Sequence, residues 1–508
     1  MPEQSISTTN NDAAGAACLA LGHGDNDGST GIDASARFLE ESDMAAALYR
    51  WFGTALVDDH SLSRDRIVRR LNQDISVIDA LITEQVQAIL HHPAFQKLEA
   101  AWRGVRYLTE QCGYGDGVKI KILNVSWYEI DRDINRAAAF DQSQMFKKIY
   151  NNEFGMPGGE PIGLLVGDYE VRHRPMPDHR IDDLSTLEGL GYAAAAAFAL
   201  LIVGASPALF GLDHIADVEQ PIDFDAIFSQ REYDRWRLFQ RREDARFIAV
   251  TLPRVLMRLP YEDRGLHAYG FRFIEDLDAD DGSCYLWGNA SFAFASVAIR
   301  AFRETGWLAD VRGVDPDTVS CGLVAGLPCM DTATDHPGLL PKPVTEVQIS
   351  DAVDKTLTDL GFLPLSDCKT TGYAAFYGSS TIQTAKVYDR KIATSNARLS
   401  TNLQHMLCAS RFAHYVKIMA RDKIGSFLTA DRISDMLNRW LLGYCNASET
   451  SGTELDARYP LKNARVQVKE QSGRPGNFWC TIHLEPRFQF DRVVSSINLV
   501  TELARTTP

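Results

Sequence analysis

The chain has 508 residues, of which 45% are hydrophobic and 23% are charged, as expected for a soluble globular protein of two to four domains. Its formal net charge is -15 and it has no sustained Lys/Arg run, so a nucleic-acid partner is not expected. The nine cysteines stand singly, without a C-x-x-C pair, which suits a reducing cytoplasm.

The N-terminal residues, 1 to about 32, are rich in Asn, Ser, Thr, Gly and Asp, and we expect a flexible tail rather than a secretory signal. A short helical pattern follows over residues 33–56. Further on, residues 192–212 carry no charge and are long enough to span a bilayer. Their consecutive alanines and the breaking residues near Gly204 and Pro207 favour instead a helix buried in a protein core, without stable membrane insertion.

The clearest amphipathic helix of the chain begins near residue 63. Its aliphatic residues recur three or four positions apart, which places them on one face: Ile67, Leu71, Ile75, Ile78, Ile82, Val86 and Ile89. This set is called the aliphatic stripe below. It fits either an intramolecular core, which the sequence alone slightly favours, or a seam for a partner helix.

The next segments alternate between helical and strand patterns. Helices are predicted over residues 94–111, 128–139, 187–203 and 285–307. Strands are predicted over residues 118–125, 162–166, 247–252, 345–349, 362–365 and 374–377. Residues 308–345 are dense in Gly, Pro and Asp and are expected to be irregular. The alternation indicates a mixed α/β middle region.

Two helices are predicted near the C-terminus. The first is one long helix from about residue 395, with apolar residues at helical spacing, and Gly425 ends it: Leu399, Leu403, Met406, Leu407, Ala413, Val416 and Ile424. Thr429 can cap the second helix, whose buried face is formed by Ile433, Met436, Leu437, Trp440 and Leu441.

A β-hairpin follows these helices. Apolar residues alternate with polar ones on both sides of a Ser-Gly-Arg-Pro-Gly turn, which is typical of two half-buried strands. The opposite face carries Arg465, Gln467, Trp479, Thr481 and His483. Because an exposed Trp is unusual, we expect this face or an edge of the strand pair to be covered, either within the domain or by a partner.

The chemical motifs tested each lack a required residue. Asp276, Asp278 and Asp280 have calcium-loop spacing, but the loop lacks the turn glycine and the bidentate glutamate. Gly189 and Gly191 lack a preceding strand and are expected to serve helix packing. No G-x-x-x-x-G-K-[ST] motif occurs, and no cofactor, metal or catalytic residue is assigned. His414 is expected to be a hydrogen-bonded structural histidine.

Several segments resemble the large subunit of the type VI secretion contractile sheath. In the C-terminal part they are RFAHYVK at 411–417, RDKIG at 421–425, PLKNARVQV at 460–468 and EPRF at 485–488. Upstream they are HHPAFQKLEAAWRGVRYL at 91–108, EDARFIAVTLPRVLMRLPY at 243–261 and YLWGNASFAFA at 285–295. These ordered matches run from about residue 60 to the end of the chain.

The resemblance implies a non-enzymatic subunit of α/β fold, with mixed sheets, flanking helices and strands completed by a small sheath partner. The expected parts are a flexible N-terminal tail and short helix (1–60), a helical or α+β outer region (61–160), a middle α/β domain (161–345) and a C-terminal inner sheath domain with long helices and the β-hairpin (346–508). Other implied partners are an inner tube protein, baseplate components and a ClpV-like disassembly ATPase. The sheath would lie in the bacterial cytoplasm on a membrane-anchored baseplate.

The resemblance also implies roles for particular residues. The polar face of the hairpin would lie near a sheet shared between subunits, and the aliphatic stripe would pack on a helix of the small subunit. The residues implied in contact with the inner tube are Arg421, Lys423, Arg432, Asp435 and Arg439. The alternatives are a cytosolic α/β enzyme with a non-local active site and the sheath of a phage-tail-like particle. No N-terminal helix for the ATPase can be placed.

Overall fold

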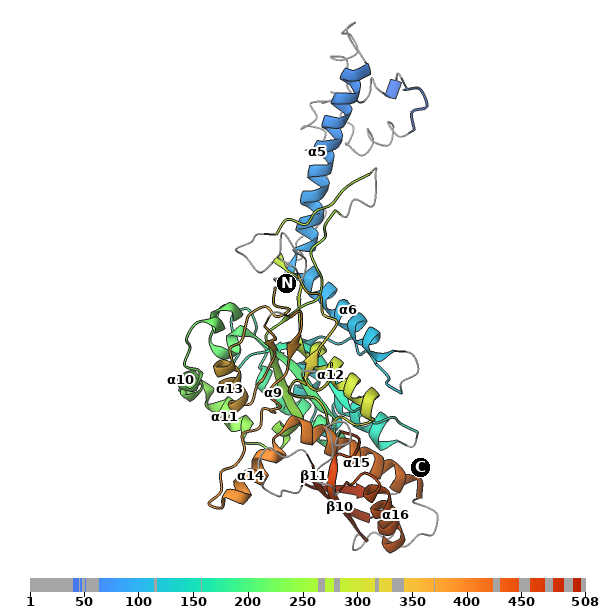
Figure 1. Cartoon of the computed structure of the whole chain (residues 1–508), viewed down its shortest axis with the longest axis vertical. Coiled ribbons are helices and arrows are strands. Elements are labelled where there is room, and N and C mark those ends of the chain that lie inside the picture. The colour runs from blue at the N-terminus through green and yellow to red at the C-terminus, as the bar shows by residue number, and fades with distance from the viewer. Residues whose placement is uncertain are drawn as a thin grey trace. The chain divides into compact units, whose positions relative to one another are not determined.

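The computed structural model describes residues 40–44, 46–47, 51, 64–113, 117–156, 158–263, 270–277, 284–315, 319–330, 342–369, 371–423, 430–446, 457–470, 478–487 and 497–503. The chain forms two compact units (Figure 1). The N-terminal unit comprises Met1–Gln96 and Pro260–Cys284, and the main unit comprises Lys97–Leu259 and Tyr285–Pro508. The four-part division expected from the sequence stays a prediction.

The N-terminal unit is built on helix α5, Arg64–Leu90, which confirms the amphipathic helix predicted there. Near its C-terminal end, α5 and the residue that follows it contact Asp276 and Glu275. Gln87 donates a side-chain hydrogen bond to the carbonyl of Asp276 (2.8 Å), and His91 bonds Glu275 (3.1 Å). Glu275 in turn accepts from the backbone N–H of Tyr261 (3.0 Å). These bonds join two segments that lie far apart in the sequence.

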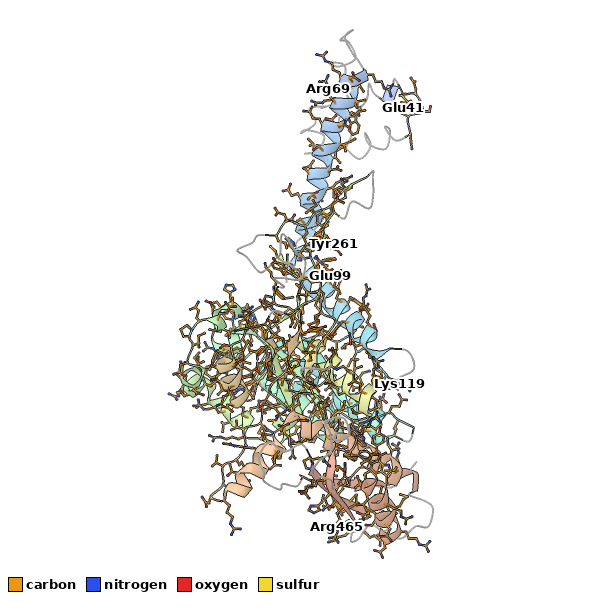
Figure 2. The ribbon with its side chains drawn as sticks, in the orientation of Figure 1. Glu41, Arg69, Glu99, Lys119, Tyr261 and Arg465 are labelled. Atoms are coloured by element: carbon orange, nitrogen blue, oxygen red, sulfur yellow. The ribbon has the colours of Figure 1, made fainter. Side chains whose placement is uncertain are left out.

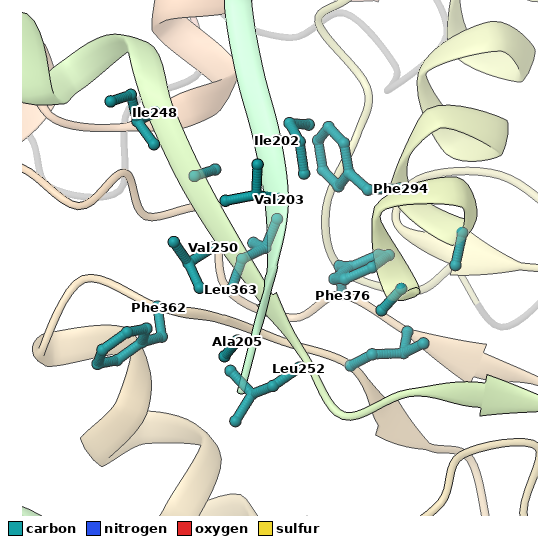
Figure 3. Packing of buried hydrophobic residues seen from close by; sticks show 14 of the residues in the cluster. Ile202, Val203, Ala205, Ile248, Val250, Leu252, Phe294, Phe362, Leu363 and Phe376 are labelled. Carbon is teal, nitrogen blue, oxygen red and sulfur yellow. The ribbon is translucent and has the colours of Figure 1, made fainter. Parts of the chain in front are cut away.

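The main unit is organised around a parallel sheet with strand order β1-β2-β3-β7. The strands are β1 (Leu164–Val171), β2 (Leu200–Ala205), β3 (Ile248–Leu252) and β7 (Leu363–Pro364). Every residue of β2 and β3 is buried, as expected for short apolar runs covered on both faces. Figure 3 shows their side chains packed with Phe294, Phe362 and Phe376.

Helices cover this sheet. Helix α9 (Asp183–Ala197) connects β1 to β2, and α12 (Ala290–Thr305) contacts β1, β2 and β3. Helix α12 begins after Asn289, whose side chain accepts from the N–H of Ser291, and ends at Gly306 in the left-handed conformation (φ 77°). The mixed α/β class predicted for this region is therefore confirmed.

The helix predicted over 187–203, and the core helix predicted over 192–212, are wrong in their second halves. Helix α9 ends at Ala197 because Phe198 is left-handed (φ 51°), and β2 begins two residues later. A continuous apolar run has no periodicity that distinguishes a buried helix from a buried strand. Here the run includes the end of α9 and the whole of β2. Within the described residues, no helix is long and apolar enough to cross a membrane.

Two predicted strands are also wrong. Residues 118–125 form no strand and pair with none in the described part of the chain. Lys119 and Lys121 form ion pairs with Glu160 and Glu153. Residues 345–349 contribute only an isolated bridge between Thr345 and Val255. In both cases alternation of apolar residues is present, but a strand also needs a neighbour for its backbone.

The long helix predicted from residue 395 is two helices, α14 (Lys391–Ser400) and α15 (Leu403–Lys423). The break falls at Asn402, whose side-chain oxygen accepts from the N–H of Gln404 (3.1 Å) and the hydroxyl of Ser379 (2.8 Å). Asparagine that caps a helix in this way favours a new helix start over continuation. Ile424, Gly425 and Thr429 lie outside the described residues.

The C-terminal elements form a second core. Helix α16 (Ala430–Leu442) and an antiparallel sheet, β10-β11-β12, pack against α15. The strands are β10 (Leu461–Glu470), β11 (Phe478–Pro486) and β12 (Ile497–Leu503). The predicted hairpin is confirmed, whereas β12 was not predicted. This core includes Trp307, which stacks on Phe412 at a centroid distance of 4.1 Å.

The structure contains further helices and short strands. The helices are α6 (Pro93–Cys112), α7 (Trp127–Arg136), α8 (Gln144–Phe146), α10 (Phe224–Ser229), α11 (Asp234–Gln240) and α13 (Asp351–Asp359). The strands are β4 (Val255–Leu256), β5 (Trp287–Gly288), β6 (Leu323–Val324), β8 (Ser366–Asp367) and β9 (Ala374–Ala375). Helices α6 and α7 match those predicted over 94–111 and 128–139.

The glycines of α9 give a test of its packing. A Cβ atom at Gly189 would lie 2.4 Å from Cγ2 of Ile134 on α7. We expect Gly189→Ala to lower the free energy of unfolding by about 1–2 kcal/mol, because this overlap outweighs the helix-propensity gain of about 1 kcal/mol. Urea denaturation measures the change. Gly163→Ala is the control, since its Cβ would meet no atom within 4 Å; equal stability of the two variants would contradict the packing role.

Candidate assembly interface

The polar face of the β10–β11 hairpin is assembled as the sequence pattern implies. In the antiparallel register Arg465 pairs with His483, Gln467 with Thr481, and Lys469 with Trp479. Side chains directly opposite each other share a face, so the five predicted residues lie together. Trp479 is 41% exposed, and a hollow of about 260 Å³ is lined in part by Arg465, Gln467 and His483 (Figure 2 labels Arg465).

The opposite face of the same hairpin is internal. Ala464, Val466 and Val468 of β10 are buried with Cys480 and Ile482 of β11, against the apolar side of α16. Because side chains alternate between faces along a strand, this burial fixes which residues point outward. The outward residues are therefore available to whatever lies on that side of the sheet.

The charged residues predicted near the inner tube divide into two places. Arg432, Asp435 and Arg439 are exposed on α16, three and four positions apart, and so form one face. Arg421 of α15 instead donates a hydrogen bond to the carbonyl of Met156. The side chain of Lys423 lies outside the described residues. The structure thus brings three of the five residues onto one helix surface.

Within the described residues, the aliphatic stripe of α5 is only partly covered: Ile67, Leu71, Ile78 and Val86 are half-buried. None of its seven residues is buried, and Ile75, Ile82 and Ile89 are exposed, Ile75 by 52% and Ile89 by 56%. Asp74 is the buried residue of this helix. The described residues therefore do not bury the stripe, and its packing on a partner helix stays a prediction, because a periodic pattern shows that a face is apolar without showing what covers it.

Helix α6 adds exposed apolar residues that were not assigned to an interface. Leu98 and Trp102 are both exposed and lie four positions apart, hence on one face. The sequence pattern predicted the helix over residues 94–111 without assigning these two residues a role. Their solvent exposure marks them as candidate interface residues. The sequence alone does not show this exposure, because it depends on tertiary packing.

Three buried titratable side chains of the main unit, His414, Cys408 and Cys480, are held in their uncharged forms. His414 donates from Nε2 to the carbonyl of Ala197 (2.8 Å), and burial lowers its pKa to about 4, so it is neutral near pH 7. Burial raises the pKa of Cys408 and Cys480 to about 12, which keeps both as thiols. Among the described residues, no group of three or more acidic, His or Cys side chains is arranged to hold a metal ion.

Gly189 and Gly191 serve packing rather than nucleotide binding. Both lie inside α9, not in a turn between a strand and a helix. Besides the approach of Ile134 to Gly189, a Cβ atom at Gly191 would lie 3.0 Å from Cδ1 of Ile248. Of the calcium-loop candidates, Asp278 and Asp280 lie outside the described residues.

Comparisons with known proteins cover both cores. Residues 72–383 match the family described as EvpB/VC_A0108, tail sheath N-terminal domain. Residues 392–503 match the EvpB/VC_A0108 tail sheath gpW/gp25-like domain, which contains α15, α16 and the C-terminal sheet. Over 450 residues the chain is also 37% identical to the type VI secretion system sheath protein TssC1 of Pseudomonas aeruginosa, with 88% of each chain covered.

The fold and these matches define a tail sheath protein, built of an N-terminal sheath domain and a gpW/gp25-like domain. Within this class, the chain belongs to the family of type VI secretion sheath large subunits, as its segments predicted.

The buried histidine of α15 predicts a dependence of stability on pH. Burial lowers the pKa of His414 from its ordinary value of 6.5 to about 4 in the folded chain. Its contribution to the free energy of unfolding is therefore present above pH 6.5 and is lost as the pH falls toward 4. Between pH 7 and 5 we expect His414→Gln to lose on the order of 2 kcal/mol less stability than the parent chain. Urea denaturation at both pH values measures this.

The control is Met419→Leu, on the same helix, which changes no titrating group and should keep the parental pH dependence. If His414→Gln also kept it, the histidine would not be held neutral in the fold.

Proposed function

We propose that this chain co-assembles with a small sheath subunit into a tube around an inner tube protein and contracts to propel that inner tube into a target cell. The observation that carries the proposal is the unburied aliphatic stripe of α5. A 27-residue helix with seven aliphatic residues on one face, none of them buried, needs a partner to remove that face from water.

The small sheath subunit is the proposed occupant of the stripe. Fully burying an Ile side chain contributes about 1.5–3 kcal/mol, so even partial burial of seven such residues provides a strong interface. The exposed Leu98 and Trp102 of α6 are further candidates for contacts between subunits. Large hydrophobic interfaces are typical of obligate complexes, which fits a subunit that acts only within an assembly.

The inner tube would be held by charges rather than by a large apolar surface. We propose that Arg432, Asp435 and Arg439 on α16 face it. Exposed ion pairs contribute about 0–1 kcal/mol each, so such contacts can position the tube and still release it when the sheath contracts. Arg421 and Lys423 remain candidates, although Arg421 already bonds the carbonyl of Met156 within this chain.

The C-terminal sheet would connect neighbouring subunits. Main-chain bonds between strands hold two chains together through their backbones, and they tolerate changes in subunit orientation better than side-chain packing does. The polar face formed by Arg465, Gln467, Trp479, Thr481 and His483 would then lie beside the shared sheet.

The energy for contraction would be stored during assembly. In this proposal the extended tube is metastable, and the contracted tube buries more surface per subunit. A small gain at each subunit is multiplied along the tube. Cytoplasmic assembly on a membrane-anchored baseplate, and dismantling by a ClpV-like ATPase, complete the proposed cycle.

Electron microscopy of the chain expressed with and without the small sheath subunit tests the proposal. We expect hollow ridged tubes only after co-expression, and we expect them to form and contract without added nucleotide. Tubes from this chain alone would indicate a single-chain, phage-tail-like sheath. Discrete particles in both samples would contradict the sheath function and favour an enzyme with a distributed active site.

A variant of the aliphatic stripe tests the interface with the small subunit. We expect Ile75→Ser to weaken pairing with the small subunit by roughly 10-fold or more, since it removes an apolar contact that forms only on assembly. Co-purification yield and tube number measure the effect. Val77→Ser is the matched control, because Val77 is 40% exposed on the same helix but lies roughly 160° around it from Ile75. If the two variants weakened pairing equally, the aliphatic stripe would not be the surface that contacts the small subunit.

A further inference from the structure

The C-terminal sheet has two edges, and one of them is occupied by a side chain. The strand order β10-β11-β12 leaves one side of β10 and one side of β12 without a neighbouring strand in the described chain. Unpaired strand edges are templates for other strands, so a protein whose sheets join subunits must control which edge is available. Helix α16 packs directly against β10 (Figure 1).

Asn438 of α16 bonds both backbone groups of Val466, at the centre of β10. Its Oδ1 accepts from the N–H of Val466 (2.7 Å), and its Nδ2 donates to the carbonyl of Val466 (2.9 Å). The hydroxyl of Ser434 donates to the same carbonyl (3.1 Å). A carboxamide has the donor and acceptor of a peptide group, so Asn438 occupies the place that a neighbouring strand would take.

The register shows which edge this is. Val466 lies opposite Ile482 of β11, and its two backbone groups are used by Asn438 rather than by β11. In an antiparallel sheet successive residues direct these groups to alternate sides. Val466 therefore directs its N–H and carbonyl away from β11, to the outer edge of β10.

Asn438 is held in this position by its own helix. Its Nδ2 also donates to the carbonyl of Ser434 (2.9 Å), four residues earlier. Ile433, Leu437 and Leu441 of the same helix are buried in the second core. An incoming strand would have to break the bonds to Val466 and also displace a helix anchored by three buried side chains.

We propose that Asn438 is an edge guard, which closes the β10 edge to other sheath strands and leaves the β12 edge as the one that pairs with a strand of another sheath polypeptide. This inference rests on the proposed sharing of the C-terminal sheet. By the same alternation, Ile482 directs its backbone groups toward Leu499, so the next residue, Val500, directs its own to the outer edge of β12.

The first test is hydrogen exchange, followed by mass spectrometry, of peptides covering β10 in the full chain. We expect Asn438→Ala to speed exchange in β10 at least 10-fold and to cause concentration-dependent association in sedimentation. Asn135→Ala is the matched control, because Asn135 lies on α7 and bonds Asp131 (2.7 Å). Ser434→Ala removes the hydroxyl bond to the Val466 carbonyl but keeps both bonds between Asn438 and Val466, so we expect a smaller increase in β10 exchange. This variant still tests the proposal if Asn438→Ala does not fold.

The second test is tube assembly with the small sheath subunit. Proline lacks the N–H, so Val500→Pro removes an outward donor of β12 while the pairing of Leu499 with Ile482 is retained. We expect Val500→Pro to reduce tube formation at least 10-fold with β10 exchange unchanged.

The outcomes separate the two proposals. If Asn438→Ala and Ser434→Ala both showed the same β10 exchange rate and the same association as the parent chain, Asn438 would not be an edge guard. If Val500→Pro formed tubes as the parent chain does, the β12 edge would not be the one that pairs with another sheath polypeptide. If the parent pair forms no tubes, the proposed function fails, while the exchange measurement still decides whether Asn438 closes β10.

Discussion

The main unit depends on the junction at the end of α9, where two hydrophobic cores meet. His414 of α15 donates to the carbonyl of Ala197, the last residue of that helix. The next residue, Phe198, packs against both cores and turns the chain into β2 through a left-handed conformation. An unpaired buried carbonyl is costly, so the neutral imidazole satisfies the helix end while it ties the gpW/gp25-like domain to the parallel sheet.

Helix α16 has three distinct roles on three parts of its surface. Ile433, Leu437 and Leu441 fill the second core, and Asn438 bonds the outer edge of β10. Arg432 and Arg439 face outward. One helix therefore joins the second core, the β10 edge and the charged residues proposed to face the inner tube.

Periodicity predicted the elements whose two faces differ. The steps of three and four from Ile67 to Ile89 located α5, and the alternation from Ala464 to Val468 located the hairpin and its outward residues. The same reasoning failed at Leu200–Ala205, where a buried parallel strand has no polar face to produce a period. It also failed at Asn402, where a local cap divides an otherwise continuous helical pattern.

The amino-acid sequence by itself therefore determined the family, the α/β class, α5 and the hairpin, because these depend on local spacing and on long ordered segments. Only the tertiary structure decided that no residue of the aliphatic stripe is buried among the described residues, that Arg421 bonds the carbonyl of Met156, and that Asn438 bonds the backbone of Val466 in β10. Each of these depends on a neighbour distant in the sequence, and a pattern along one segment holds no information about which neighbour the fold will bring to it.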